Sequence, residues 1–225
     1  MVFSMWLNPF FVVHFVTYWS VSLACMVKDF NLTVDGSELE AKYNTTLDGK
    51  QHLINWKLYF YATGRSLAIQ LFVLAPLVEC FGYLYEWRGV SELLPLTKLV
   101  LSSFIVESLF YCGHRLCHYG TFRRFHVLHH ELVVPVAAAT LYASVFENVF
   151  VNILPVLVTP LIVGMTTDML YVWAFLSTFV ATLAHSGFKC LSFFTEHHSL
   201  HHLRKNSNYS VGGILDAFFG SYERS

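Results

Sequence analysis

The chain has 225 residues, of which 55% are hydrophobic, 17% aromatic and only 13% charged. A soluble globular domain carries about 25% charged residues, so this deficit indicates a protein whose solvent is a lipid bilayer. The formal net charge of -1 provides no electrostatic attraction to nucleic acid.

The first predicted element is a membrane segment near the N-terminus. Residues 3–27 contain no Asp, Glu, Lys or Arg, and about 20 apolar residues suffice to cross a bilayer. The segment has no basic start and no clear small-residue cleavage site, which favours a retained span over a signal peptide. Asn8-Pro9 and His14 weaken its hydropathy, so a re-entrant or interfacial segment is an alternative. We interpret His14 as a polar packing residue.

A polar loop is predicted over residues 28–57, and it contains two glycosylation-type sequons, at Asn31 and Asn44. Apolar runs follow at 66–85 and 96–113. If both runs cross the membrane, the loop shares a side with the histidines described below and the sequons are not glycosylated. If only one run crosses, the loop lies on the opposite, luminal side. The first alternative is mildly favoured, because loop lysines tend to lie on the cytosolic side.

The second half of the chain predicts a helical hairpin through the membrane. Residues 132–167 contain one charged residue, Glu147, and residues 169–184 contain none. Pro155, Pro160 and Gly164 predict kinks or a break. The expected fold is therefore an all-α integral membrane protein with about four transmembrane helices and a histidine-rich helical cap on one membrane face. We expect N-terminal membrane segments and loop over residues 1–95 and a second region over 96–225, which contains the histidine motifs described below, in one structural unit.

Histidine is the residue type that needs a special explanation. Five of the 12 histidines lie between His114 and His130, and four lie between His197 and His202. On a helix, positions i, i+3 and i+4 share a face. His114 and His118 have this spacing, as do two further groups: His126, His129 and His130, then His198, His201 and His202. Burying so many polar rings without partners is costly, and imidazole is a ligand for iron, copper, zinc and nickel.

The cysteines do not suggest a thiolate metal site. The five cysteines form no C-x-x-C pair, and we interpret them as reduced packing residues. His185 ends an apolar run, where it can reach the other histidines, whereas His197 points to a different side of a helix and is a less certain ligand. Two crossings between the second and last groups return the chain to the same face, so all groups can meet there.

These motifs resemble the fatty acid hydroxylase / sterol desaturase superfamily over roughly residues 96–222. The first motif runs from Glu107 through His114 to His118, and the second comprises His126, His129 and His130, followed by Glu131 and Pro135. His185-Ser-Gly-Phe188 is similar to an element of the 4-methylsterol oxidase branch. The C-terminal motif, from His197 through Asn208-Tyr209 and Asp216 to Gly220, is also similar to that branch. Residues 152–160 resemble the fatty acid hydroxylase domain-containing proteins.

The resemblance implies two iron ions that activate O2, with electrons from NAD(P)H delivered through cytochrome b5 or a reductase. It implies a multi-pass protein of the endoplasmic reticulum membrane, with its histidines facing the cytosol and a sterol methyl group or fatty-acyl chain as substrate. The implied metal ligands are His114, His118, His126, His129, His130, His185, His198, His201 and His202. We expect Glu107, two helical turns before His114, to support the imidazoles. Asn208 and Tyr209 are further candidates, and Glu147 is a poorer one.

Two departures from the family pattern stand out. Many relatives have a histidine where this chain has Ser144, and the fatty-acyl hydroxylase branch has one where this chain has Lys189. The second departure argues against a ceramide-type substrate. A desaturase of the same superfamily and a catalytically inactive relative remain alternatives. A histidine-rich metal transporter belongs to a different class, and it would require ligands at mid-membrane.

Overall fold

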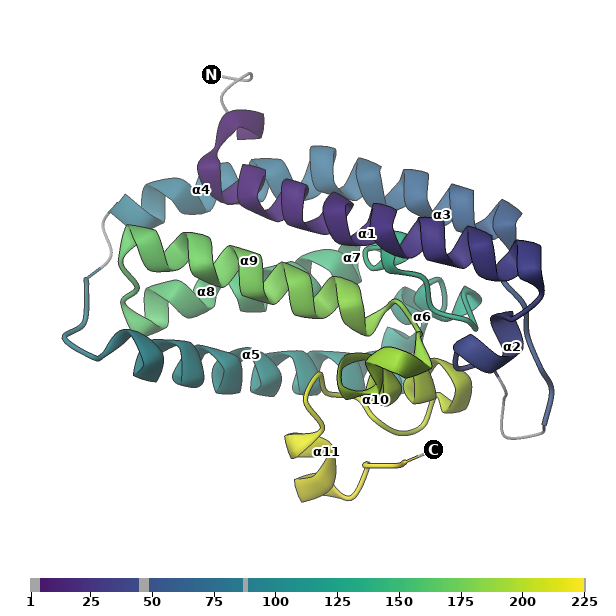
Figure 1. The fold of residues 1–225 in the computed structure, drawn as a ribbon. Coiled ribbons are helices and arrows are strands. Elements are labelled where there is room, and N and C mark those ends of the chain that lie inside the picture. Colours follow the sequence, from purple (N-terminus) through teal and green to yellow (C-terminus); the bar gives the residue numbers. More distant parts are fainter. Residues whose placement is uncertain (1–4, 45–48, 87–88, 225) are drawn as a thin grey trace.

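The computed structural model describes residues 5–44, 49–86 and 89–224, and their regular structure is helical apart from isolated bridge residues, among them the pair Lys42 and Phe188 (Figure 1). The longer helices are α1 (Pro9–Asp35), α3 (Trp56–Ile69), α4 (Ala75–Glu86), α5 (Pro95–Cys117), α8 (Leu154–Val163), α9 (Thr167–Ala184) and α10 (Ser192–Arg204). The shorter α-helices are α2 (Glu38–Ala41), α6 (Arg123–His126), α7 (Val145–Glu147) and α11 (Ile214–Phe219). Two π-helical turns are η2 (Gln70–Leu74) and η6 (Asn148–Ile153). The 3-10 turns are η1 (Met5–Leu7), η3 (Gly120–Phe122), η4 (His129–Glu131), η5 (Ala137–Ala139) and η7 (Lys189–Leu191).

The all-α membrane fold that the composition predicts is confirmed, but the described residues contain five helices long and apolar enough to cross a bilayer, not about four. These helices cover 9–35, 56–86, 95–117, 145–163 and 167–184. Large apolar side chains on their outer surfaces are exposed, among them Val16, Phe72 and Phe104. Such exposure is expected where hydrocarbon replaces water as the solvent.

The boundaries of the predicted polar loop were too wide. Helix α1 begins where the Asn8 side chain accepts a hydrogen bond from the Phe10 amide, 3.0 Å away, with Pro9 in the first turn. It continues through Asp35 and ends at Gly36, whose φ of +76° is the left-handed conformation that glycine adopts readily. The next span begins at Trp56, so the connecting segment is shorter than residues 28–57.

Two prolines explain the π-helical turns inside the long spans. Pro76 and Pro155 each lack the backbone N–H that would bond to the carbonyl four residues earlier. The π-helical turns η2 and η6 each end two residues before one of these prolines, and their wider turn accommodates the missing hydrogen bond. The spans 56–86 and 145–163 therefore remain continuous, and the predicted break is confined to Gly164, between α8 and α9.

The predicted membrane run over 132–167 was wrong in its first third. Residues 132–144 do not cross the membrane; they form turns and the 3-10 helix η5. Their apolar character has another cause, because Ala137, Ala138 and Ala143 are fully buried inside the histidine cap. The cap, as we use the term, comprises residues 118–144 and 185–224. A short apolar stretch can thus serve a buried core as well as a bilayer.

The helices pack in layers, with α1 against α9, α8 against α5, and α4 against α8 (Figure 1). At the end opposite the cap, the Lys98 ammonium donates to the carbonyls of Ser91 and Gly164, at 2.8 and 3.0 Å. At the cap end, the Tyr43 amide donates to Gly187, 3.0 Å away. The segment after α1 therefore lies on the same side as the cap, as the first topological alternative predicts.

Candidate metal centre

Nine histidines, eight from the cap and His114 from the last turn of α5, come together as two groups. Within each group, one ligand atom from every residue lies within 4.8 Å of the others. The first group consists of His114, His118, His126, His130 and His201. The second group consists of His129, His185, His198 and His202. All nine histidines predicted as ligands are therefore gathered in the two groups, and seven of them are less than 9% exposed.

The second and the last histidine motifs each contribute to both groups, which the spacing did not predict. In α10, His198 and His202 are one turn apart and share the second group, while His201 turns towards the first. The neighbours His129 and His130 also separate, and they lie in η4 after α6 has ended at His126. The second motif is thus a broken helix, and adjacent side chains diverge to opposite groups.

The orientation of the imidazoles is set mainly by backbone carbonyls. A carbonyl can only accept a hydrogen bond, so each ring nitrogen facing one carries the proton. This holds for Nδ1 of five histidines: His114 to Tyr209 at 2.6 Å, His129 to Tyr142 at 3.3 Å, His185 to Ala181 at 2.8 Å, His201 to Ser207 at 2.7 Å and His202 to Leu132 at 2.9 Å. In the neutral ring, Nε2 then has no proton and carries a lone pair that can bind a metal ion.

Facing lone pairs indicate a cation site. Nε2 of His202 lies 3.1 Å from Nε2 of His129, and neither nitrogen has a proton to share. His114 and His126 face each other in the same way, at 3.1 Å. Two ligands at right angles around a metal, with bonds of about 2.1 Å as for zinc, lie about 3.0 Å apart. The donor sets therefore fit metal ions, which would convert a repulsive contact into a ligand pair.

Burial keeps the cap imidazoles in the form that binds metals. It lowers the pKa of His129, His198 and His202 well below 6.5, and neighbouring imidazoles act in the same direction. Burial, aided by the nearby His114, lowers the pKa of His118 to about 3. The rings are therefore neutral at pH 7, and a metal ion need not displace protons from them.

Glu147 supports an imidazole directly, whereas Glu107, the favoured candidate, contacts no histidine in the described contacts. Glu147 Oε1 accepts from His126 Nδ1 at 2.7 Å, with both side chains buried. Glu107 Oε2 instead accepts from the amides of Val211 and Gly212, at 3.1 and 3.0 Å. Glu107 thus holds the loop that follows α10. The two-turn spacing from His114 predicted a shared face but not this partner.

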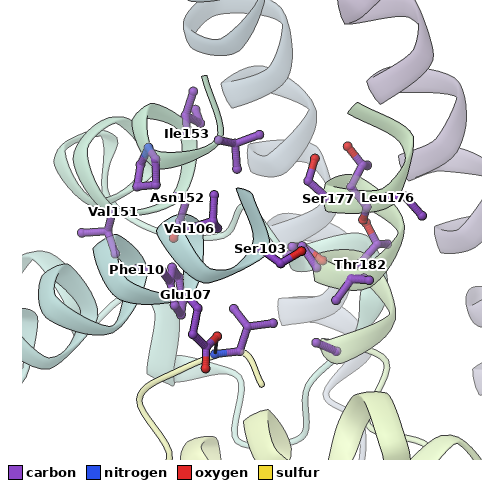
Figure 2. A pocket seen from close by; sticks show the side chains of 18 of the residues that line it. Ser103, Val106, Glu107, Phe110, Val151, Asn152, Ile153, Leu176, Ser177 and Thr182 are labelled. Carbon is purple, nitrogen blue, oxygen red and sulfur yellow. Dashed lines mark hydrogen bonds between the residues drawn. The ribbon is translucent and has the colours of Figure 1, made fainter. Parts of the chain in front are cut away.

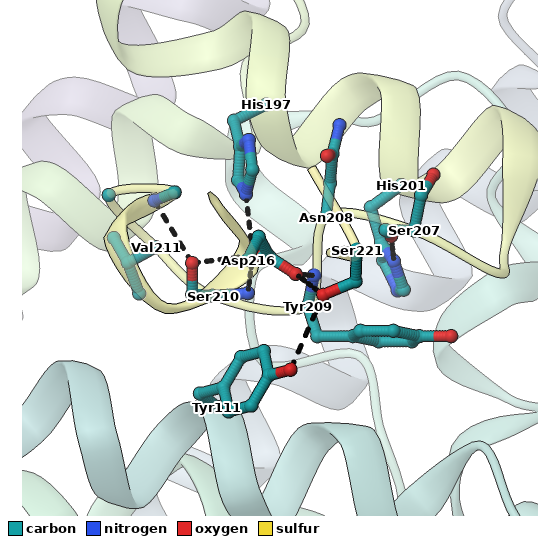
Figure 3. Close-up of polar contacts among 12 residues, drawn as sticks. Tyr111, His197, His201, Ser207, Asn208, Tyr209, Ser210, Val211, Asp216 and Ser221 are labelled. Atoms are coloured by element: carbon teal, nitrogen blue, oxygen red, sulfur yellow. Dashed lines mark hydrogen bonds and ion pairs between the residues drawn. The ribbon is translucent and has the colours of Figure 1, made fainter. Parts of the chain in front are cut away.

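That loop is organised by Asp216, a residue that sequence reasoning noted only within the family motif. Its carboxylate accepts from the amides of Tyr209 and Ser210 and from the hydroxyls of Ser210 and Ser221, all within 2.9 Å (Figure 3). Burial raises the pKa of Asp216, but the hydrogen bonds outweigh it and hold this pKa below its ordinary value. Asp216 thereby fixes the loop whose carbonyls orient His114 and His201.

The remaining predicted residues have supporting positions in the same region. His197, the less certain ligand, belongs to neither metal group. Its Nε2 instead forms a hydrogen bond with Asp216, 2.9 Å away. Tyr209 acts through its carbonyl. The Asn208 side chain bonds the backbone of Glu223, so it closes the C-terminal segment and contacts no histidine in the described contacts. Ser144, where many relatives have a histidine, caps α7 by accepting from the Glu147 amide at 3.1 Å.

An apolar cavity of about 610 Å³ leads from the spans to the histidines. Its walls come mainly from α1, α5, η6, α8 and α9, with Ser103, Val106 and Phe110 on one side and Leu176 and Ser177 on another (Figure 2). His114 of the first group also lines it, as do His129, His185 and His198 of the second. The size is typical of a small-molecule site, and the walls suit a hydrocarbon ligand.

Comparison with known proteins identifies the family. The sequence model of the fatty acid hydroxylase family matches residues 99–221. The human fatty acid hydroxylase domain-containing protein 2 is 38% identical over 129 residues, which cover 56% of this chain and 38% of that protein. Fatty acid hydroxylase ahd1 of Mycosarcoma maydis is 28% identical over 236 residues, or 95% of this chain and 60% of that protein. C-4 methylsterol oxidase erg25 of Schizosaccharomyces pombe is 31% identical over 134 residues, or 52% of this chain and 45% of that protein.

The chain therefore spans well under two thirds of the human relative's length. No solved structure matches it. The match to the family model covers more than half of the chain and includes all nine clustered histidines, from His114 to His202. This chain belongs to the fatty acid hydroxylase family.

Proposed function

We propose that this chain is a membrane-bound, di-iron enzyme that uses O2 to hydroxylate a C–H bond of a lipid. The observation that carries the proposal is the meeting of two imidazole groups with an apolar cavity that extends into the spans. Relatives named as a fatty acid hydroxylase and a methylsterol oxidase support a lipid substrate, such as a fatty-acyl chain or a sterol methyl group.

The two groups would each hold one iron ion, five imidazoles around the first and four around the second. When bound, the iron pair supplies an oxidant strong enough for an unactivated C–H bond, which no side chain can provide. One atom of O2 would enter the substrate and the other would leave as water, with two electrons from NAD(P)H through cytochrome b5 or a reductase and two protons from solvent. The histidines would face the cytosol from the endoplasmic reticulum membrane.

The protein's own contribution is to orient the ligands and to exclude water. The carbonyls and Glu147 hold the rings from outside, so that their Nε2 atoms converge without further rearrangement. The apolar cavity walls keep water from the reacting carbon, and His185 and His198 bring the second group to the cavity surface. A lipid can thus approach this group from the membrane without entering water.

The position of the histidines favours an enzyme over a metal transporter. A transporter needs ligands at mid-membrane, along a path between the two faces. Here the ligands gather in the cap and in the last turn of α5, at the end of the spans, and cap carbonyls hold the rings of His201 and His202.

The test is the lipid profile and iron content of the purified protein and of cells that express it. The double variant His129→Ala with His201→Ala removes one ligand from each group, and His52→Ala, in the segment before α3, is the matched histidine control. We expect about two iron ions per chain and an oxidised lipid in the wild type and the control, and loss of both in the double variant. Identical lipid profiles for iron-loaded wild type and the double variant would contradict the proposal.

A further inference from the structure

His14 lies on the wall of the cavity, away from both metal groups. It belongs to α1, which is outside the part of the chain that matches the family model. Its Nδ1 lies 2.8 Å from the Thr178 hydroxyl of α9, and both residues line the cavity. The sequence suggested a packing residue, and the contact with Thr178 accounts for one of its two ring nitrogens.

The other nitrogen has no partner. His14 Nε2 is buried and makes no hydrogen bond among the described residues. If the Thr178 hydroxyl donates to Nδ1, Nε2 is a free donor; if Nδ1 donates, Nε2 is a free acceptor. In apolar surroundings, an unsatisfied polar atom is costly unless a ligand bonds it. A hydroxyl group can donate and accept, so it satisfies Nε2 in either tautomer.

Two neighbouring hydroxyl groups on the same wall are already satisfied. The Tyr18 hydroxyl, one turn from His14 on α1, donates to the Ala138 carbonyl at 2.9 Å. The Ser177 hydroxyl, next to Thr178, donates to the Trp173 carbonyl at 2.7 Å. Unlike these two hydroxyl groups, Nε2 of His14 still lacks a hydrogen-bond partner. A polar atom of a ligand could therefore form a hydrogen bond with it.

The geometry points to His14 as a recognition site for a hydroxyl group on the bound lipid, which we propose as a specificity-determining contact. This inference rests on the proposed function, because it assigns the cavity to the substrate. Thr178 and His185 are seven residues apart, which corresponds to about 10 Å along α9. The recognised hydroxyl group thus lies about 10 Å from the level of the second metal group, and the substrate class is a long lipid with an oxygen function remote from the metal.

The experiment measures the binding of hexadecan-1-ol and of hexadecane to the purified protein in detergent, without oxygen or reductant. Tryptophan fluorescence is a suitable signal, because Trp173 lines the cavity. The quantity compared is the ratio of the two affinities in each protein, so that partition into micelles cancels between variants. The variant His14→Phe keeps a ring and removes the polar nitrogens, and Tyr18→Phe is the control, because its hydroxyl is already bonded.

We expect the alcohol preference of the wild type to fall about fivefold in His14→Phe, the equivalent of about 1 kcal/mol for one hydrogen bond. Tyr18→Phe should retain the preference. His14→Leu provides a second apolar variant if the phenyl ring disturbs folding, as judged by circular dichroism. An unchanged preference in the folded His14 variants, or an equal loss in Tyr18→Phe, would overturn the inference. Neither result depends on turnover, so the proposed oxidation fails or stands separately, by its lipid profile and iron content.

Discussion

The contact between Glu147 and His126 allows a quantitative test of how the cap holds a metal ion. The variant Glu147→Ala removes the acceptor 2.7 Å from His126 Nδ1, in a place where both side chains are buried. The Nδ1 proton then has no partner, which costs about 1–3 kcal/mol. This cost destabilises the ring orientation in which Nε2 of His126 faces the first group. We therefore expect the affinity for iron to decrease by about 10- to 100-fold, the range typical of groups that support a metal ligand.

The assay is competition for Fe²⁺ against a coloured chelator, without oxygen, on purified protein. Glu147→Gln keeps an acceptor oxygen and should lose less affinity than Glu147→Ala. Glu92→Ala changes an exposed carboxylate before α5 and is the control, for which we expect wild-type affinity. Iron affinity of Glu147→Ala within twofold of the wild type would refute the argument that this carboxylate positions His126.

Three further predictions concern stability, read as thermal melting in detergent. Asp216→Ala leaves several buried donors unpaired and should lower the free energy of unfolding by at least about 3 kcal/mol, and the melting temperature by about 6 °C or more for a chain of this size. A smaller decrease would contradict the role of Asp216 in the loop. Gly164→Ala should lower the free energy of unfolding by about 1–3 kcal/mol, because φ is +67° and the new Cβ would lie 2.7 Å from the Ser91 amide nitrogen. The control Gly64→Ala places its Cβ in open space within α3 and should be neutral or stabilising. In the metal-free protein, burial lowers the pKa of His118 to about 3. Between about pH 6.5 and pH 3, His118 is therefore protonated in the unfolded chain but neutral in the folded chain. The free energy of unfolding should therefore fall as pH decreases from about 6.5 towards 3. A melting temperature that increases as pH is lowered over this range would contradict a neutral His118 in the folded protein.

The apolar runs show how far composition alone predicts a membrane fold. Hydropathy located the spans because about 20 apolar residues are needed to cross a bilayer wherever they occur. It misassigned residues 132–144, because Ala137 and Ala138 are buried by protein and not by lipid. It also could not show that α1 continues to Asp35, since a polar helix end and a polar loop have the same composition.

The sequence by itself determined the class of the protein and the set of histidines, because composition and the i, i+3, i+4 spacing are local properties of the chain. Only the tertiary structure decided how His129 and His130 divide between the two groups and that Glu147, not Glu107, bonds an imidazole. These features depend on partners far apart in sequence: His114 bonds a carbonyl 95 residues away, and His202 one 70 residues away. A backbone carbonyl has no side chain to mark it, so only folding reveals which carbonyls hold the rings.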